Sequence, residues 1–148
     1  MTCFTDVAEN RLIDWLFRGQ AAPALPASWY FGLLNSPTND AASPLAEVTG
    51  NGYARVAVAR TLAAFAGTQG VGTTAASTGA SATTSNNADV VFAAPTGDWG
   101  SISSLGIFDA AVGGNLWFYA PLAAAKTVNN GDAPPKFPTA AFTFTLDN

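Results

Sequence analysis

Short apolar runs separated by turn-forming residues are the strongest constraint that this sequence places on its fold. The segment 28–34 is rich in aromatic residues, and the segment 140–147 alternates Phe or Leu with smaller, mostly Thr side chains. Gly and Asn, which accept positive φ angles, gather at 50–52, 113–115 and 129–132 and favour tight turns there. No alternation of helix and strand suggests a parallel sheet. We therefore predict a mainly β fold, an antiparallel β-sandwich of the jelly-roll kind.

Two of these turns have strand-like segments on both sides and predict hairpins. The segments 45–49 and 53–60 flank the first turn, and the segments 101–108 and 116–122 flank the second. A further short strand is expected at 89–93, where two valines precede a phenylalanine.

The first twenty residues predict a short amphipathic helix, separate from a sandwich domain at 21–148. Asp6 is the expected N-cap, because Glu9 follows at the spacing of a capping box, and Gly19 is placed to end the helix. The apolar face combines two pairs at i, i+4 spacing with an aromatic neighbour: Leu12, Ile13, Trp15, Leu16 and Phe17. A short helix with such a face needs something to pack on, which is either its own sheet or a partner subunit.

The segment 61–88 differs from the rest because it has no charged residue and consists mostly of Ala, Gly, Ser and Thr. A loop of this length is uncommon inside a compact domain. Three interpretations stay open: a flexible excursion, an arm lying on a neighbouring subunit, or a pair of poor strands.

The composition excludes several classes of function. The chain has no histidine and one cysteine, so it offers neither an imidazole base nor an internal disulfide nor a histidine or cysteine metal site. Six basic residues in a chain of net charge −4 do not form the positive stripe that nucleic acid requires. Its apolar runs are shorter than the roughly 20 residues of a spanning helix, and acidic residues stand where a signal peptide would be basic. We expect no cofactor, no metal and no membrane insertion.

The low charge also bears on assembly. Only 11% of the residues are charged, against about 25% in an ordinary soluble domain. Large uncharged surfaces promote association, so we expect copies of the chain, or other proteins, to cover part of this one. The alternative is a monomer with a surface of Thr, Ser, Asn and Ala side chains.

No catalytic constellation stands out, and we predict that the chain is not an enzyme. Asp98 and Asp109 are considered as an acid/base pair, but both lie at turns, where carboxylates usually cap backbone amides. The segment 129–132 has oxygen ligands suitable for calcium, although a plain turn explains it better.

The tryptophans separate into core candidates and one candidate for recognition. Trp29 and Trp117 stand in predicted strands and are expected in the core. Trp99 stands in a turn, where it either joins the core or forms an exposed anchor for a sugar or a protein interface. Together with Leu12, Trp15, Leu16 and Phe17, it completes our candidate partner interface.

Several motifs occur in an order that resembles a known family. The opening LIDW of the helix is followed by five short motifs: GYAR at 52–55, DWG at 98–100, GIFDA at 106–110, GGNL at 113–116 and KTVNNGD at 126–132. With the Thr/Phe-rich end, this sequence resembles a family of small tailed-bacteriophage virion proteins that are usually labelled phage tail fibre proteins. It departs from that family in the long segment 61–88 and at Ser104-Leu105, where a His-Phe pair is common.

The resemblance implies a structural virion component that is made in the host cytoplasm and needs no cofactor. The first hypothesis is a tail fibre or appendage subunit, anchored through its N-terminal helix and assembled as an oligomer with copies of itself and other tail proteins. The first alternative is a capsid decoration protein that clamps capsid proteins with the segment 61–88. The second is a carbohydrate-binding module that uses Trp99 or neighbouring loops on a host surface glycan.

Overall fold

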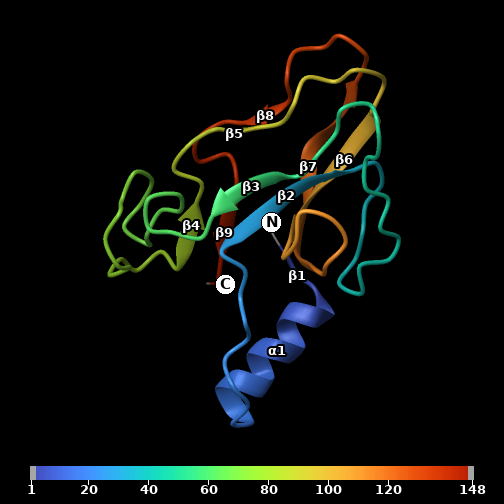
Figure 1. Cartoon of the computed structure of the whole chain (residues 1–148). Helices are drawn as coiled ribbons and strands as arrows, with labels where there is room; N and C mark the ends of the chain where they lie inside the picture. The colour runs from blue at the N-terminus through green and yellow to red at the C-terminus, as the bar shows by residue number, and fades with distance from the viewer. Residues whose placement is uncertain (1–2, 147–148) are drawn as a thin grey trace.

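The computed structural model describes residues 3–146 and shows a mainly β molecule from which one helix protrudes (Figure 1). In chain order the elements are β1 (Cys3–Phe4), α1 (Asp6–Phe17), β2 (Ser28–Leu34), β3 (Val56–Ala59), β4 (Thr83–Ser85), β5 (Val90–Val91), β6 (Gly100–Phe108), β7 (Leu116–Val128), β8 (Lys136–Phe137) and β9 (Thr143–Thr145). The mainly β, antiparallel fold with one N-terminal helix is confirmed.

A five-stranded antiparallel sheet in the order β1-β7-β6-β2-β3 forms the main layer. Phe31 and Leu33 of β2 lie opposite Ile107 and Leu105 of β6, so these four side chains share one face. β6 and β7 form the hairpin predicted around 113–115, with φ angles of 62° at Gly113 and 69° at Gly114. The prediction of this hairpin and of the strand at 28–34 is confirmed.

β7 is longer than its sequence pattern predicted, because an irregularity lets it continue past residue 122. Ser104 lies opposite Pro121, whereas Ile102 lies opposite Lys126, so the register shifts between these pairs. Pro121 has no amide hydrogen to donate to the ladder, which explains why regular pairing is interrupted near it.

The second layer consists of two small sheets, β4-β9 and β5-β8, which help to cover one face of the main sheet. The core between the layers is aromatic and aliphatic: Phe31, Leu33, Val90, Phe92, Trp99, Leu105, Ile107 and Phe142 are all buried there. In the last strand the predicted alternation holds for Phe142 and Phe144, but Leu146 is 67% exposed.

The opposite face of the main sheet is covered by the loop that joins β2 to β3. Its Gly50-Asn51-Gly52 turn has the expected positive φ angles of 70°, 52° and 77°. The predicted hairpin between 45–49 and 53–60 is wrong, however. The Val48 amide donates to Leu33, and β3 pairs with the first half of β2, so both segments lie along the same edge of that strand.

The Arg55 side chain holds this loop against the main sheet. Its guanidinium donates to both carboxylate oxygens of Glu47 (2.7 and 2.6 Å) and to the carbonyls of Ala110 and Gly113 (2.6 and 2.8 Å). It also lies 3.4 Å from the centre of the Phe108 ring. Space is tight at this point, because a Cβ on Gly32 would lie 2.9 Å from that ring.

The segment 61–88 is folded back onto its own chain and contains β4. The Ala66 amide donates to Ser85, and β4 pairs with β9. The Asn86 side chain is buried and bonds to the backbone of Ala88, Pro138 and Phe142. Hydrogen bonds therefore tie the beginning of the segment to its end, and β4 and Asn86 tie that end to the body.

Candidate functional site

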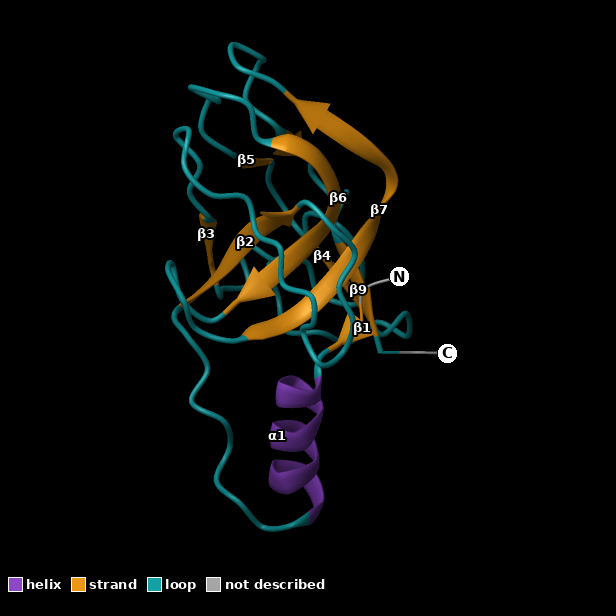
Figure 2. Ribbon diagram, turned by 90° about the vertical axis from the view of Figure 1, so that its right-hand side faces the viewer, coloured by secondary structure: helices purple, strands orange, loops and turns teal. Residues whose placement is uncertain are grey.

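α1 projects away from the body, and Figure 2 shows this protrusion from the side. The helix begins at Asp6, and its N-cap is Thr5 rather than the predicted Asp6. The Thr5 amide still donates to the carbonyl of Trp117, which prolongs the β1-β7 pairing by one residue. The buried Thr5 hydroxyl donates to the Leu116 carbonyl (2.6 Å) and makes no capping bond to the helix. The side chain that stands at the N-cap thus ties the helix to the sheet.

The first half of α1 is held by the body. Ala8 is fully buried, and the Arg11 guanidinium lies 4.9 Å from the centre of the Trp117 ring. The Trp117 indole nitrogen in turn donates to the carboxylate of Asp109 (3.0 Å). The base of the helix therefore has a defined position relative to the main sheet.

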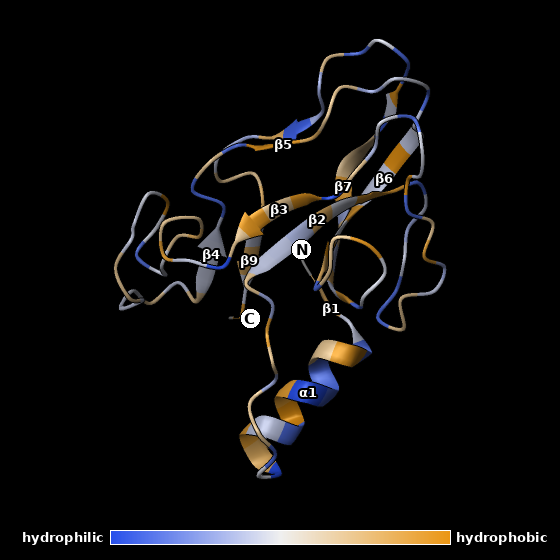
Figure 3. Ribbon diagram, viewed as in Figure 1, coloured by the Kyte–Doolittle hydropathy of each residue, from blue (hydrophilic) through white to orange (hydrophobic). Residues whose placement is uncertain are grey.

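The second half of α1 exposes its apolar side chains to solvent. Ile13 is 50% exposed, Trp15 46%, Leu16 58% and Phe17 82%, whereas Leu12 is half-buried. Figure 3 shows hydrophobic bands along the protruding helix. The alternative in which this face packs on its own sheet is therefore wrong for the four outer residues.

The linker that follows the helix leaves this apolar face uncovered. Gly19 ends the helix as predicted, with a φ angle of 68°, and the chain then returns along α1 towards β2 (Figure 2). Linker residues Gln20, Ala21, Pro23 and Ala24 share one surface depression with Arg11, Asp14 and Asp109. The linker thus faces the polar side of α1.

Charges on α1 are arranged unequally at its two ends. Asp6 and Glu9 lie in the first turn, where the positive end of the helix dipole favours them. The last turn contains no basic residue, and Arg18, which follows it, is paired with Asp14 (2.7 Å).

Trp99 is not the exposed anchor that one interpretation of its turn suggested. Its side chain is only 4% exposed and packs edge-on against Tyr53, with ring centres 5.4 Å apart. Its indole nitrogen donates to the Asn51 carbonyl (2.8 Å). Trp99 is therefore a core residue, as is Trp117, while Trp29 is partly buried at the edge of the core.

The turn carboxylates cap backbone amides, as the sequence predicted. Asp98 accepts from the Asn130 amide (2.8 Å), Asp132 from the Asn129 amide (2.8 Å) and Asp109 from the Asn115 amide (2.7 Å). Burial opposes the charged form of Asp109, but hydrogen bonds from Asn115 and Trp117 outweigh it and hold the pKa of Asp109 below its usual range.

Within residues 3–146, no three acidic, cysteine or histidine side chains gather closely enough to hold a metal ion. The same residues form no helix with the length and apolar character that crossing a membrane demands.

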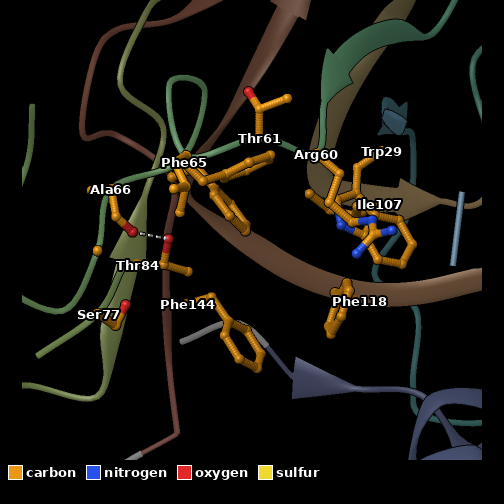
Figure 4. Close-up of a pocket in the computed structure, with 13 residues that line it drawn as sticks. Trp29, Arg60, Thr61, Phe65, Ala66, Ser77, Thr84, Ile107, Phe118 and Phe144 are labelled. Atoms are coloured by element: carbon orange, nitrogen blue, oxygen red, sulfur yellow. Dashed lines mark hydrogen bonds between the residues drawn. The ribbon is translucent and has the colours of Figure 1, made fainter. Parts of the chain in front are cut away.

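A second feature of the surface is an apolar pocket that the sequence analysis did not predict. It has a volume of about 490 Å³ and is lined by aromatic side chains, among them Trp29, Phe65, Phe118 and Phe144 (Figure 4). These residues come from β2, the segment 61–88, β7 and β9. The alternation of Phe142 and Phe144 predicted that one of its walls is apolar, but no local pattern showed which segments meet there.

The architecture defines an antiparallel, mainly β structural domain with a protruding helix. The sequence matches the model of the family described as podophage GP4 fiber I protein gp80 over residues 3–145, and the chain belongs to this family of phage fibre proteins. The resemblance stated above is thereby confirmed. No curated protein matches the chain. Membership of a fibre family makes the chain a structural component of a bacteriophage virion.

Proposed function

We propose that this protein is a tail fibre or appendage subunit, which assembles as an oligomer and is held in the virion through α1. The observation that carries the proposal is the outer half of α1. There, Ile13, Trp15, Leu16 and Phe17 remain 46–82% exposed within residues 3–146. The family supports the class of protein, and the helix supports the mode of attachment.

The size of this apolar face is consistent with a docking role. The four side chains expose on the order of 500 Å², because a large apolar side chain presents about 150–250 Å² when fully accessible. At about 25 cal/mol per Å², covering them yields roughly 12 kcal/mol before other costs. Association itself costs about 4–15 kcal/mol. The helix thus supplies a large part of a stable interface, and the partner must contribute further contacts.

The two alternatives have less support than the fibre subunit. The carbohydrate-binding module used Trp99 or neighbouring loops, and the Trp99 ring lies in the core. The capsid clamp used the segment 61–88, which bonds to its own body through β4 and Asn86. The fibre subunit therefore remains our proposal.

The test compares the oligomeric state of the native chain with that of Leu16→Ser/Phe17→Ser, by size-exclusion chromatography with light scattering. We expect a concentration-dependent oligomer for the native chain and a monomer for the double variant. Val112→Ser is the matched control, because Val112 is 89% exposed in the turn between β6 and β7, outside α1. Far-UV circular dichroism verifies that each variant is folded. A native chain that stays monomeric and binds no tail component contradicts the proposal.

A further inference from the structure

The pocket beside β9 has an apolar, aromatic lining, which suits an apolar side chain better than a polar ligand. Phe118 and Phe144 pack edge-to-face with ring centres 5.2 Å apart, and Trp29 lies 5.4 Å from Phe118. Figure 4 shows these rings around the same hollow. Water in such a space finds few hydrogen-bond partners, so its displacement by an apolar group is favourable.

Two polar side chains at the pocket already bond to the backbone. The Thr84 hydroxyl donates to the Ala66 carbonyl (2.8 Å), and Arg60 Nε donates to the Pro26 carbonyl (2.9 Å). The rest of the Arg60 guanidinium and the hydroxyls of Thr61 and Ser77 are the minor part of a lining that is mostly aromatic and aliphatic. Apolar side chains are therefore the ligand chemistry that the pocket fits.

We propose that the pocket receives the outer end of α1 from a second copy of the chain. This inference rests on the proposed function, because it names the partner of the same exposed helix. Ile13, Leu16 and Phe17 have i, i+3 and i+4 spacing and form one ridge on the helix. The pocket is lined by residues outside α1, so the ridge and the pocket are two different surfaces of the chain.

The ridge and the pocket match in size. A dry cavity of about 150 Å³ accommodates one benzene ring. The pocket volume of about 490 Å³ is thus sufficient for roughly three groups of that size, which is the number that the ridge presents.

The charges of the two surfaces are also complementary. The carbonyl groups at the end of α1 carry partial negative charge, and Arg18, the cation that follows the last turn, is already paired with Asp14. Arg60 is the one charged side chain among the described residues that line the pocket. When the ridge enters the pocket, Arg60 is the cation available to the helix end.

Such a contact joins two different surfaces of identical chains. It is therefore heterologous, and it closes into a ring or continues as a filament according to the rotation between subunits. Each copy then supplies one helix and one pocket, so both apolar surfaces of the chain are covered in the assembly.

The test is disulfide crosslinking between separately made variants, all in a Cys3→Ser background. One protein carries Arg18→Cys at the helix end, and the other carries Thr61→Cys or Ser77→Cys at the pocket. These positions are exposed and leave the apolar residues in place. We expect mixing to yield a disulfide-linked dimer of the helix variant with either pocket variant, at least about tenfold above a mixture with the exposed control Val112→Cys. Non-reducing electrophoresis and mass spectrometry identify the product.

The outcomes separate this inference from the proposed function. If Arg18→Cys crosslinks mainly to a second copy of itself, the helix pairs with another helix. That result contradicts the binding of the helix in the pocket but agrees with helix-mediated assembly. If an oligomer forms but neither pocket variant crosslinks above the control, the inference is also overturned. A native chain that stays monomeric contradicts the proposed function itself.

A charge variant offers a second measurement that involves no cysteine. Arg60→Glu is expected to weaken association about tenfold or more, because it places a negative charge against the helix end. Arg60→Lys keeps the positive charge and is expected to retain association. Lys126→Glu, on an exposed part of β7, is the control for the change in net charge. Equal association of Arg60→Glu and the native chain would contradict the proposed placement of the helix end.

Discussion

The loop around Arg55 and the outer half of α1 contain similar side chains in opposite environments. The Arg55 side chain is 5% exposed, pairs with Glu47 and lies on the ring of Phe108. At the end of α1, Arg18 pairs with Asp14 at a similar distance of 2.7 Å, but its side chain is 70% exposed and Phe17 beside it is 82% exposed. An ion pair between an arginine and an acidic residue is thus largely buried in one region and open to solvent in the other.

This contrast indicates a division of roles between the two regions. A buried ion pair is costly to break, because removing one partner leaves the other charge desolvated. An exposed pair contributes about 0–1 kcal/mol. The body thus contains the interactions on which folding depends, whereas the outer helix can change with little effect on the free energy of unfolding. Three variants test this division, and they are given from the largest expected effect to the smallest.

Arg55→Ala is expected to lower the free energy of unfolding by about 3–5 kcal/mol, because the Glu47 carboxylate, which is only 19% exposed, and two carbonyl groups lose Arg55 as a donor. Urea unfolding followed by tryptophan fluorescence measures the change. Arg18→Ala is the matched control and should differ from the native chain by about 0.5 kcal/mol or less. Equal losses in the two variants would contradict the division between body and helix.

Asp109→Asn is expected to cost about 1–2 kcal/mol at neutral pH, since the amide cannot accept from all three donors at the β6-β7 turn. The lowered pKa of the native carboxyl predicts the pH dependence. A carboxyl with a lowered pKa stabilises the fold above the pKa of the unfolded chain, and this stability is lost as the pH falls through its folded pKa.

The difference in free energy of unfolding between the native chain and Asp109→Asn should therefore shrink below about pH 4, the ordinary pKa range of an aspartate. Urea unfolding at a series of pH values measures it. Asp40→Asn, in an exposed loop, serves as a control. A difference that stays constant down to pH 2 would mean that the charge of Asp109 does not matter.

Phe17→Ala is expected to change the free energy of unfolding of the monomeric chain by less than about 0.5 kcal/mol, because the ring has few neighbours to lose. Thermal unfolding at a concentration below that of assembly measures the effect. Phe108→Ala, in the body, provides the contrasting case, since that ring is fully buried and its loss should cost about 3–5 kcal/mol. A large destabilisation by Phe17→Ala would show that the helix end is part of the folded core.

Local patterns predicted much of the fold. The aromatic run of β2 and the Gly-Gly-Asn turn before β7 were both identified, because strand and turn preferences act over a few residues. The Gly50-Asn51-Gly52 turn was also found, but its flanks pair with β2 instead of with each other. A turn specifies a reversal of the chain, and the choice of strand partner depends on a distant edge that no local pattern contains.

The candidate site was predicted only in part. The apolar residues of α1 were identified from their spacing, and the core was one of the two places predicted for Trp99, whereas the role of Thr5 was not identified. Thr5 stands at the N-cap because the pairing of β1 with β7 extends to it, and its hydrogen bonds join residues more than 110 positions apart. The same holds for the pocket, whose aromatic side chains come from four separate segments.

The amino-acid sequence alone determined a β-rich chain with few charges and one amphipathic helix, since composition and short-range periodicity are sufficient for these properties. The tertiary structure decided that the apolar side of this helix faces solvent and that Arg55 pairs with Glu47 above the Phe108 ring. It also brought together the aromatic side chains that line the pocket. These features depend on which remote segments come together, and that is settled by the packing of the whole chain.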